Sequence, residues 1–252
     1  MSGVIRRSSS PAPPADSLGR LPHAAVVDRP TFLIELATGR RVIDLGFVDR
    51  GRTDSKRAHG EWLHERLAAV SSAIVGIDAD EQGVEEARRR GLDARLADCQ
   101  DADSLAALAL EPAELIIAGE LIEHLDAPGV FLRAIRPLVA ADGMLAITTP
   151  NPLALTNVLL GLARREVQNV DHVGWQSWRT LDTLLERNGW RTERLAFYMH
   201  PRYVSPAGAP RGIKARTWTF NTYQTLATPL FMVAPSTADG LIVVARRAGD
   251  PE

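Results

Sequence analysis

Short apolar runs alternate along the chain with segments whose apolar residues recur every three or four positions. The first pattern predicts buried strands and the second predicts amphipathic helices. Strands are expected at Arg41 to Phe47, Ala73 to Asp78, Leu115 to Gly119, Met144 to Thr149 and, from a weaker pattern, Asp93 to Ala97. Helices are expected at Gly60 to Val70, Glu81 to Arg90, Pro128 to Val139 and Trp178 to Arg187. This alternation predicts an α/β fold with a parallel sheet and helices on both faces.

The order of elements changes in the last hundred residues. A strongly apolar helix is expected at Leu153 to Ala163, and two more strands are expected at Arg194 to Met199 and Leu241 to Ala245. The sheet then has seven strands, mostly parallel, in a doubly wound arrangement. Residues 200–239, rich in Pro, Thr and aromatics, are predicted to form a long loop, a lid or an insertion with its own short elements, because structureless loops of such length are uncommon and often functional.

Composition places the chain among ordinary globular proteins. At 252 residues, 45% hydrophobic and 24% charged, it suits a single domain, expected over residues 23–252 after a flexible Ser, Pro and Ala-rich tail at residues 1–22. The formal net charge of −2 lacks the basic excess typical of nucleic-acid-binding proteins, so nucleic acid is not the expected partner. The oligomeric state is not readable from the sequence.

Two further absences indicate the compartment. Cys99 is the single cysteine, so no intramolecular disulfide can form, which fits a reducing cytoplasm. No apolar run approaches the roughly 20 residues that cross a bilayer, and the N-terminus lacks a signal-peptide core. The sequence therefore predicts a cytoplasmic protein without a transmembrane segment.

Acidic residues and a glycine follow two strands of the predicted sheet. The first strand ends in Asp44, Leu45 and Gly46, and the second ends in Asp78. In doubly wound sheets ligands bind at these carboxyl ends, where a glycine admits the cofactor and an acidic residue accepts hydrogen bonds from ribose hydroxyls. Because Phe47 follows Gly46 and no G-x-G-x-x-G is present, the pattern favours a nucleoside cofactor other than NAD.

These residues resemble the class I S-adenosylmethionine-dependent methyltransferases, which have a Rossmann-like sheet. The resemblance covers roughly residues 40–194 and rests on the segments VIDLG, VGIDAD, GELIEHLDAPGVFL and GMLAITTPNP. It implies S-adenosyl-L-methionine as cofactor, bound beside Gly46. It further implies that Asp44 helps to hold the methionine amino group, that Asp78 binds the ribose hydroxyls, and that Asp98 and Cys99 border the adenine.

The chain departs from that family in the turn after Gly46. The family has two further glycines where this chain has Val48 and Arg50. The departure leaves open an alternative in which the fold has lost its ligand and serves as a non-catalytic binding or scaffold protein.

A cluster of potential metal ligands follows the fourth strand. If Glu120 to His124 opens a helix, Glu120 neighbours Glu123 and His124 on one surface. A later imidazole, His172, comes from the polar loop after the fifth strand, where active-site loops gather. Two carboxylates and two imidazoles suit a divalent cation, Mg²⁺ or Mn²⁺, that keeps positions open for substrate oxygens.

This E-x-x-E-H cluster is similar to that of the metal-assisted O-methyltransferases, both the ubiquinone-synthesis type and the small-RNA 2′-O type. The resemblance implies that Glu120, Glu123, His124 and His172 hold the ion. Two alternatives stay open, namely that His124 or His172 acts as a metal-free base and that these residues have structural roles. The expected reaction is O-methylation of a small-molecule or glycan hydroxyl, with RNA 2′-O-methylation as the alternative.

Overall fold

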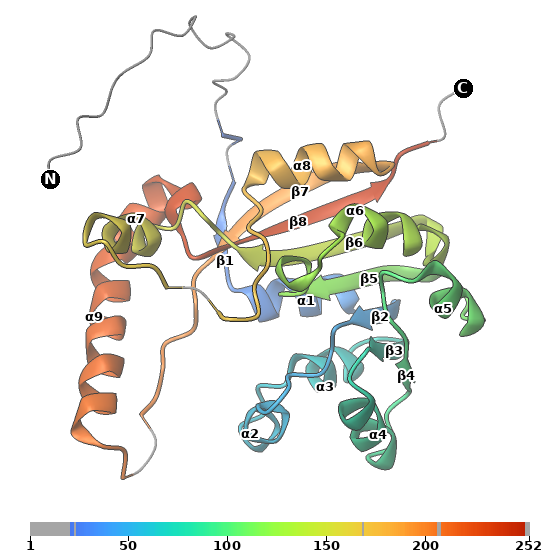
Figure 1. Cartoon of the computed structure of the whole chain (residues 1–252), viewed down its shortest axis with the longest axis horizontal. Helices are drawn as coiled ribbons and strands as arrows, with labels where there is room; N and C mark the ends of the chain where they lie inside the picture. Colours follow the sequence, from blue (N-terminus) through green and yellow to red (C-terminus); the bar gives the residue numbers. More distant parts are fainter. Residues whose placement is uncertain (1–20, 23, 168, 206–207, 250–252) are drawn as a thin grey trace, which may run out of the picture.

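A single eight-stranded sheet forms the centre of the structure, with helices on both sides (Figure 1). The computed structural model describes residues 21–22, 24–167, 169–205 and 208–249. The strand order is β1-β7-β8-β6-β5-β2-β3-β4, and neighbours are parallel except that β8 runs antiparallel to β6 and β7. The strands are β1 Val26–Val27, β2 Arg41–Leu45, β3 Ala73–Asp78, β4 Ala94–Leu96, β5 Ala113–Gly119, β6 Val139–Pro150, β7 Trp190–Tyr198 and β8 Gly240–Arg247.

The helices divide between the two faces of this sheet. Alternate residues of β5 point to opposite faces, so Ile116 packs in the cluster that holds α5, α6 and α8, and Leu115 packs in the cluster that holds α1 and α3. Burial on both faces explains why the run from Leu115 to Gly119 is apolar without interruption. The α-helices are α1 Arg29–Ala37, α2 Thr53–Ala58, α3 Leu63–Ala68, α4 Glu81–Arg89, α5 Ala102–Ala107, α6 Pro128–Ala134, α7 Leu155–Leu162, α8 Trp178–Arg187 and α9 Arg211–Val233.

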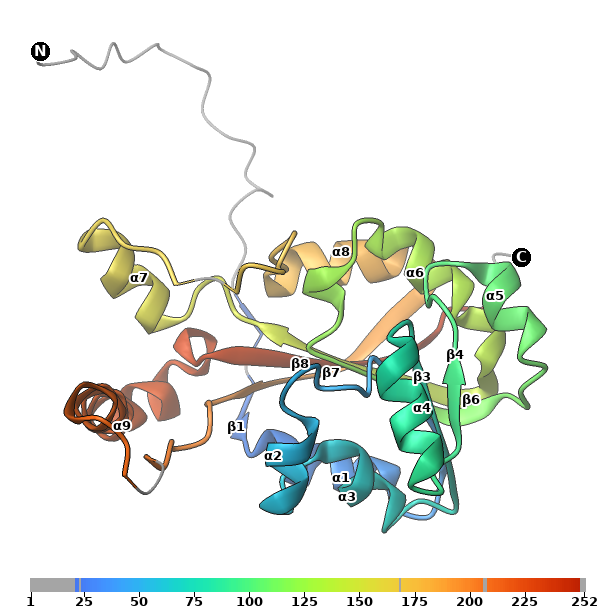
Figure 2. The same ribbon diagram turned by 60° about the horizontal axis from the view of Figure 1, so that its bottom comes forward.

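The parallel strands bring the predicted site to one edge of the sheet. Strands β4, β3, β2, β5 and β6 are consecutive neighbours and all parallel, so their carboxyl ends lie at the same edge. The turn after β2 and the 3₁₀ turn η2, Ile122–His124, both follow strands at this edge. Both views place α7 and α9 beyond one end of the sheet (Figure 1, Figure 2), and Figure 1 shows that the β5 arrow points toward this end.

The doubly wound α/β fold predicted from the apolar pattern is confirmed, with local differences. The sheet has eight strands instead of seven, because Val26–Val27 pairs with β7 as a two-residue strand too short to leave a pattern. The helix expected at Pro128 to Val139 ends at Ala134. A 3₁₀ turn, η3 Arg136–Leu138, follows it, and its Pro137 lacks the N–H that a continuing helix requires.

Residues 200–239 contain the longest helix described. Helix α9 has 23 residues, and a 3₁₀ turn, η4 Pro235–Thr237, follows it before β8. Whether this insertion acts as a lid stays a prediction. The tail expected at residues 1–22 lies, except for residues 21 and 22, outside the described residues. Within the described part of the chain, no helix combines the length and apolar character needed to cross a membrane.

Candidate active site

The turn after β2 requires glycine at its first position. Gly46 has a φ of +69°, in the left-handed region that L side chains rarely adopt. A Cβ added there would lie 2.9 Å from Cδ1 of Leu121, the residue before η2. Gly46 therefore lets the end of β2 approach the end of β5 closely, as the predicted cofactor turn needs.

Asp44 is buried beneath this turn and contacts a histidine that sequence reasoning missed. Its Oδ2 lies 2.9 Å from Nδ1 of His64 in α3, and both side chains are almost fully buried. The His64 ring packs against Phe47, with the two ring centroids 4.6 Å apart. Nothing in the sequence distinguishes His64 from a core residue on a helix.

Asp78 ends β3 with both carboxylate oxygens engaged. Oδ2 accepts a hydrogen bond from the backbone N–H of Val48 at 3.0 Å, and Oδ1 accepts one from Asp80 at 2.9 Å. Burial raises the pKa of this carboxyl group above its usual value, although these hydrogen bonds oppose the shift. Since each carboxylate oxygen offers about two lone pairs, acceptor sites remain for ribose hydroxyls.

Asp98 and Cys99 follow β4, the neighbour of β3. The backbone N–H of Ala97, just before them, donates to the Asp78 carbonyl at 3.1 Å. Burial raises the pKa of the Cys99 thiol to about 12, so the side chain is neutral. The turns after β2, β3 and β4 thus lie side by side, an arrangement that fits an elongated nucleoside cofactor.

Glu123, His124 and His172 come together at the ends of β5 and β6. Each offers one ligand atom, and these atoms lie within 4.8 Å of one another. The loop that carries His172 is fixed by backbone contacts, since the N–H groups of Val173 and Gly174 donate to the Glu123 carbonyl at 2.9 and 3.1 Å. Residues almost fifty positions apart are thereby held in one cluster.

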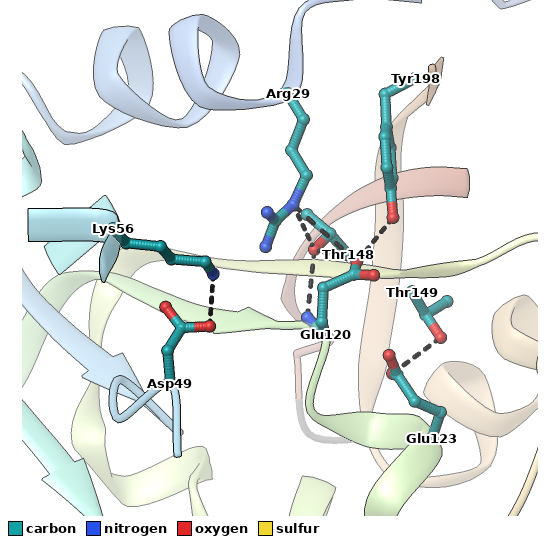
Figure 3. Close-up of polar contacts among 8 residues, drawn as sticks. All are labelled: Arg29, Asp49, Lys56, Glu120, Glu123, Thr148, Thr149 and Tyr198. Carbon is teal, nitrogen blue, oxygen red and sulfur yellow. Dashed lines mark hydrogen bonds and ion pairs between the residues drawn. The ribbon is translucent and has the colours of Figure 1, made fainter. Parts of the chain in front are cut away.

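Two of these ligand groups have buried polar atoms without a partner in the described chain. Glu123 is fully buried, and its Oε2 accepts from Thr149 Oγ1 at 2.9 Å while Oε1 has no partner (Figure 3). Burial, and then the charge of Glu120, raise the pKa of Glu123 to about 8. His172 Nδ1 is also buried without a partner, and burial lowers the pKa of this imidazole. Buried polar atoms are normally paired, so both atoms are available to a ligand such as a cation.

His124 completes a donor set that fits a divalent cation. Its Nδ1 lies 3.0 Å from the backbone oxygen of Asp171, and a proton on Nδ1 leaves Nε2 as the ligand nitrogen. The His124 and His172 rings meet edge to face with centroids 4.6 Å apart. One carboxylate and two imidazoles are ligands that Mn²⁺ and similar divalent ions accept.

Glu120 lies outside this cluster. The segment from Glu120 does not open an α-helix, since Glu120 has a φ of +53° and η2 is a single 3₁₀ turn. Its Oε1 accepts hydrogen bonds from Thr148 Oγ1 at 2.8 Å and from Tyr198 Oη at 2.6 Å, and Arg29 Nε lies 3.8 Å away (Figure 3). The structure thus brings together three of the four residues predicted as ligands and ties the fourth to a separate polar network.

Apolar side chains are exposed on the two helices beyond the sheet edge. Leu162 of α7 and Trp218 and Leu226 of α9 are each at least two-thirds exposed. The helices touch through a hydrogen bond of 2.9 Å between Thr156 Oγ1 and Tyr223 Oη.

The sheet order and the antiparallel β8 define a class I S-adenosylmethionine-dependent methyltransferase fold. Gly46 and Asp78 lie at the edge of this sheet where the resemblance predicts the cofactor. The model of the family described as "Methyltransferase domain" matches residues 28–195, so the chain belongs to this family. This membership favours an enzyme over the non-catalytic alternative.

Relatives and solved structures agree with the family. A ubiquinone biosynthesis O-methyltransferase of Parvibaculum lavamentivorans is 33% identical over 126 residues, which cover 48% of this chain and 46% of the relative. The chain spans about half the length of the curated relatives it matches. A SAM-dependent methyltransferase from Archaeoglobus fulgidus has the same fold at 15% identity, with a TM-score of 0.51 over 86% of this chain and 90% of that chain. Magnesium protoporphyrin IX methyltransferase from Synechocystis PCC 6803, with SAH bound, has a TM-score of 0.53 at 13% identity, over 87% of this chain and 82% of that one.

Proposed function

We propose that this protein transfers the methyl group of S-adenosylmethionine to a hydroxyl oxygen of a small-molecule acceptor, with a divalent cation held by Glu123, His124 and His172. The observation that carries the proposal is the convergence of these three ligand atoms within 4.8 Å at the edge where Gly46 and Asp78 lie. The relatives named as ubiquinone biosynthesis O-methyltransferases support oxygen as the methylated atom.

In the reaction the acceptor oxygen forms a bond to the methyl carbon as the carbon–sulfur bond breaks. The products are the methyl ether, S-adenosylhomocysteine and the proton that leaves the hydroxyl. A divalent cation at Glu123, His124 and His172 would lower the pKa of the hydroxyl and orient it. Asp78 would hold the ribose and so place the sulfonium in line with that oxygen.

The protein's own side chains set the remaining requirements. Thr149 donates to Glu123 Oε2 and so fixes which carboxylate oxygen faces the cluster. The Asp171 backbone oxygen accepts from His124 Nδ1 and so sets the tautomer that leaves the lone pair of Nε2 free for a cation. In the metal-free alternative, His124 or His172 would take the hydroxyl proton directly.

The acceptor class follows from surface character. The net charge of −2 disfavours RNA, and the exposed apolar residues of α7 and α9 favour a molecule with an apolar part over a highly polar glycan. A cytoplasmic location, predicted from the single cysteine, belongs to the same proposal.

Calorimetry with chelator-treated protein tests the proposal first. We expect micromolar binding of S-adenosylmethionine and S-adenosylhomocysteine without metal, and binding of Mn²⁺ that Glu123→Gln removes. Methyl transfer from labelled cofactor to catechol, a simple probe with two hydroxyls, should then require Mn²⁺ or Mg²⁺. Failure to bind either nucleoside would contradict the methyltransferase proposal, and metal-independent transfer would contradict the cation alone.

A further inference from the structure

Phe47, the first residue after Gly46, lies on a glycine of the neighbouring strand. A Cβ added to Gly76 in β3 would lie 2.8 to 2.9 Å from three carbons of the Phe47 ring. Real Cβ atoms essentially never approach other heavy atoms this closely, so the ring occupies space that only a glycine at position 76 leaves free. The indole N–H of Trp62 donates to the Phe47 carbonyl at 3.0 Å and holds the residue from the other side.

Val48, the next residue, lies on a second glycine. A Cβ added to Gly83 in the first turn of α4 would lie 2.3 Å from Cγ1 and 2.8 Å from Cγ2 of Val48, and 3.1 Å from its Cβ. Rotation about χ1 could turn one methyl group away but would leave the other facing Gly83, so a side chain at position 83 would displace the Val48 backbone.

The backbone between these two side chains is bonded to the residue predicted to bind ribose. The Val48 N–H donates to Asp78 Oδ2 at 3.0 Å. A displacement of Val48 would therefore change the position of the turn after β2 and the hydrogen bonding of Asp78 together. The two bulky residues do not fill the cofactor edge, because their side chains point into the cluster formed with Trp62 and Val84.

We propose that Gly76 and Gly83 are positioning residues for the cofactor, which take over the role of glycines missing from the turn itself. The two glycines leave room for the side chains of Phe47 and Val48. The backbone of the turn and the Asp78 carboxylate can therefore stay in the arrangement that accepts the ribose of S-adenosylmethionine. This inference rests on one part of the proposed function, namely that the ribose of the cofactor binds at Asp78.

A double-mutant cycle in the full chain tests this inference, with S-adenosylhomocysteine affinity measured by calorimetry and the free energy of unfolding measured in urea. Gly83→Ala should weaken binding by about tenfold or more, the scale expected from overpacking. Val48→Ala should lose less, because it removes the methyl groups without moving the backbone. The double variant Val48→Ala/Gly83→Ala should recover most of the affinity lost by Gly83→Ala.

Gly212→Ala is the matched control, since this glycine lies in a helix with no atom within 4 Å of an added Cβ and has a negative φ. It should leave S-adenosylhomocysteine affinity unchanged. Wild-type affinity in a folded Gly83→Ala protein, or no recovery in the double variant, would overturn the inference while leaving the proposed function intact. Absence of binding in the wild-type chain would instead overturn both. If Gly83→Ala does not fold, recovery of folding without binding in the double variant would likewise overturn the inference.

Discussion

The cofactor side and the acceptor side of the sheet edge differ in how complete they are. On the cofactor side, Phe47 and Trp62 are packed in a small apolar cluster, and Asp78 already holds two backbone N–H groups. On the acceptor side, two atoms of the predicted metal cluster, Glu123 Oε1 and His172 Nδ1, are buried without partners in the described chain, whereas on the cofactor side this holds for His64 Nε2. Nearby helices α7 and α9 expose apolar side chains.

This difference has a physical consequence for binding. A site whose groups are already fixed loses little conformational freedom when its ligand arrives, so the cofactor side is prepared for one constant molecule. The acceptor side has unsatisfied buried atoms, which cost free energy until a ligand pairs with them. The backbone contacts of Asp78 therefore hold the cofactor side in place, whereas the two unpaired atoms of the cluster leave the acceptor side more dependent on what binds there.

The largest expected effect is a loss of turnover when a residue on the acceptor side is changed. Glu123→Gln keeps the size of the side chain and an oxygen that can accept from Thr149, but it cannot ionise to give the carboxylate that a cation would bind. Methyl transfer should fall at least about a hundredfold, the scale of lost acid–base or metal assistance, with S-adenosylhomocysteine affinity unchanged. Glu111→Gln, at an exposed position before β5, is the control.

Normal turnover in Glu123→Gln would remove the chemical role of the cluster. A parallel loss of turnover and cofactor affinity would show that the two sides are not independent, and would break the comparison.

The next largest effect concerns affinity on the cofactor side. Asp78→Ala should weaken S-adenosylhomocysteine binding about ten- to a hundredfold, because hydrogen bonds to a charged group contribute about 1.5–3 kcal/mol. Calorimetry gives the affinity and circular dichroism checks the fold. Asp103→Ala, exposed in α5, should bind as the wild type does. Unchanged affinity in Asp78→Ala would refute the ribose assignment.

Local sequence patterns predicted the elements that carry their own signals. Strand β3 and helix α8 were predicted with their observed bounds, since one is an apolar run and the other has clear apolar periodicity. Helix α9 was not predicted, because its apolar and polar residues are mixed and Pro229 interrupts it. The signal for a helix was spread too evenly around its surface.

The candidate site divides in the same way. The spacing of Glu123 and His124 along the chain predicted both as ligands, and the position of its loop predicted His172. The structure places these three residues together. The contacts of Glu120 were missed because Thr148 and Tyr198 lie 28 and 78 positions away and meet it only through strand pairing. No local pattern encodes such a register, or the left-handed backbone at Glu120.

The smallest expected effect tests how far the cofactor side is fixed without ligand. Trp62→Phe removes the N–H that donates to the Phe47 carbonyl and reduces the volume of a side chain that is only 2% exposed. The free energy of unfolding should fall by about 1 to 3 kcal/mol, from a lost hydrogen bond and a small cavity. Urea denaturation measures this value with and without saturating S-adenosylhomocysteine.

If the cluster is what positions the turn, the stabilisation by cofactor should be smaller in Trp62→Phe than in the wild type, because the loosened turn must be ordered on binding. Equal stabilisation in both proteins would mean that Phe47 and Trp62 support only the fold, and that the cofactor side is fixed by the backbone contacts of Asp78.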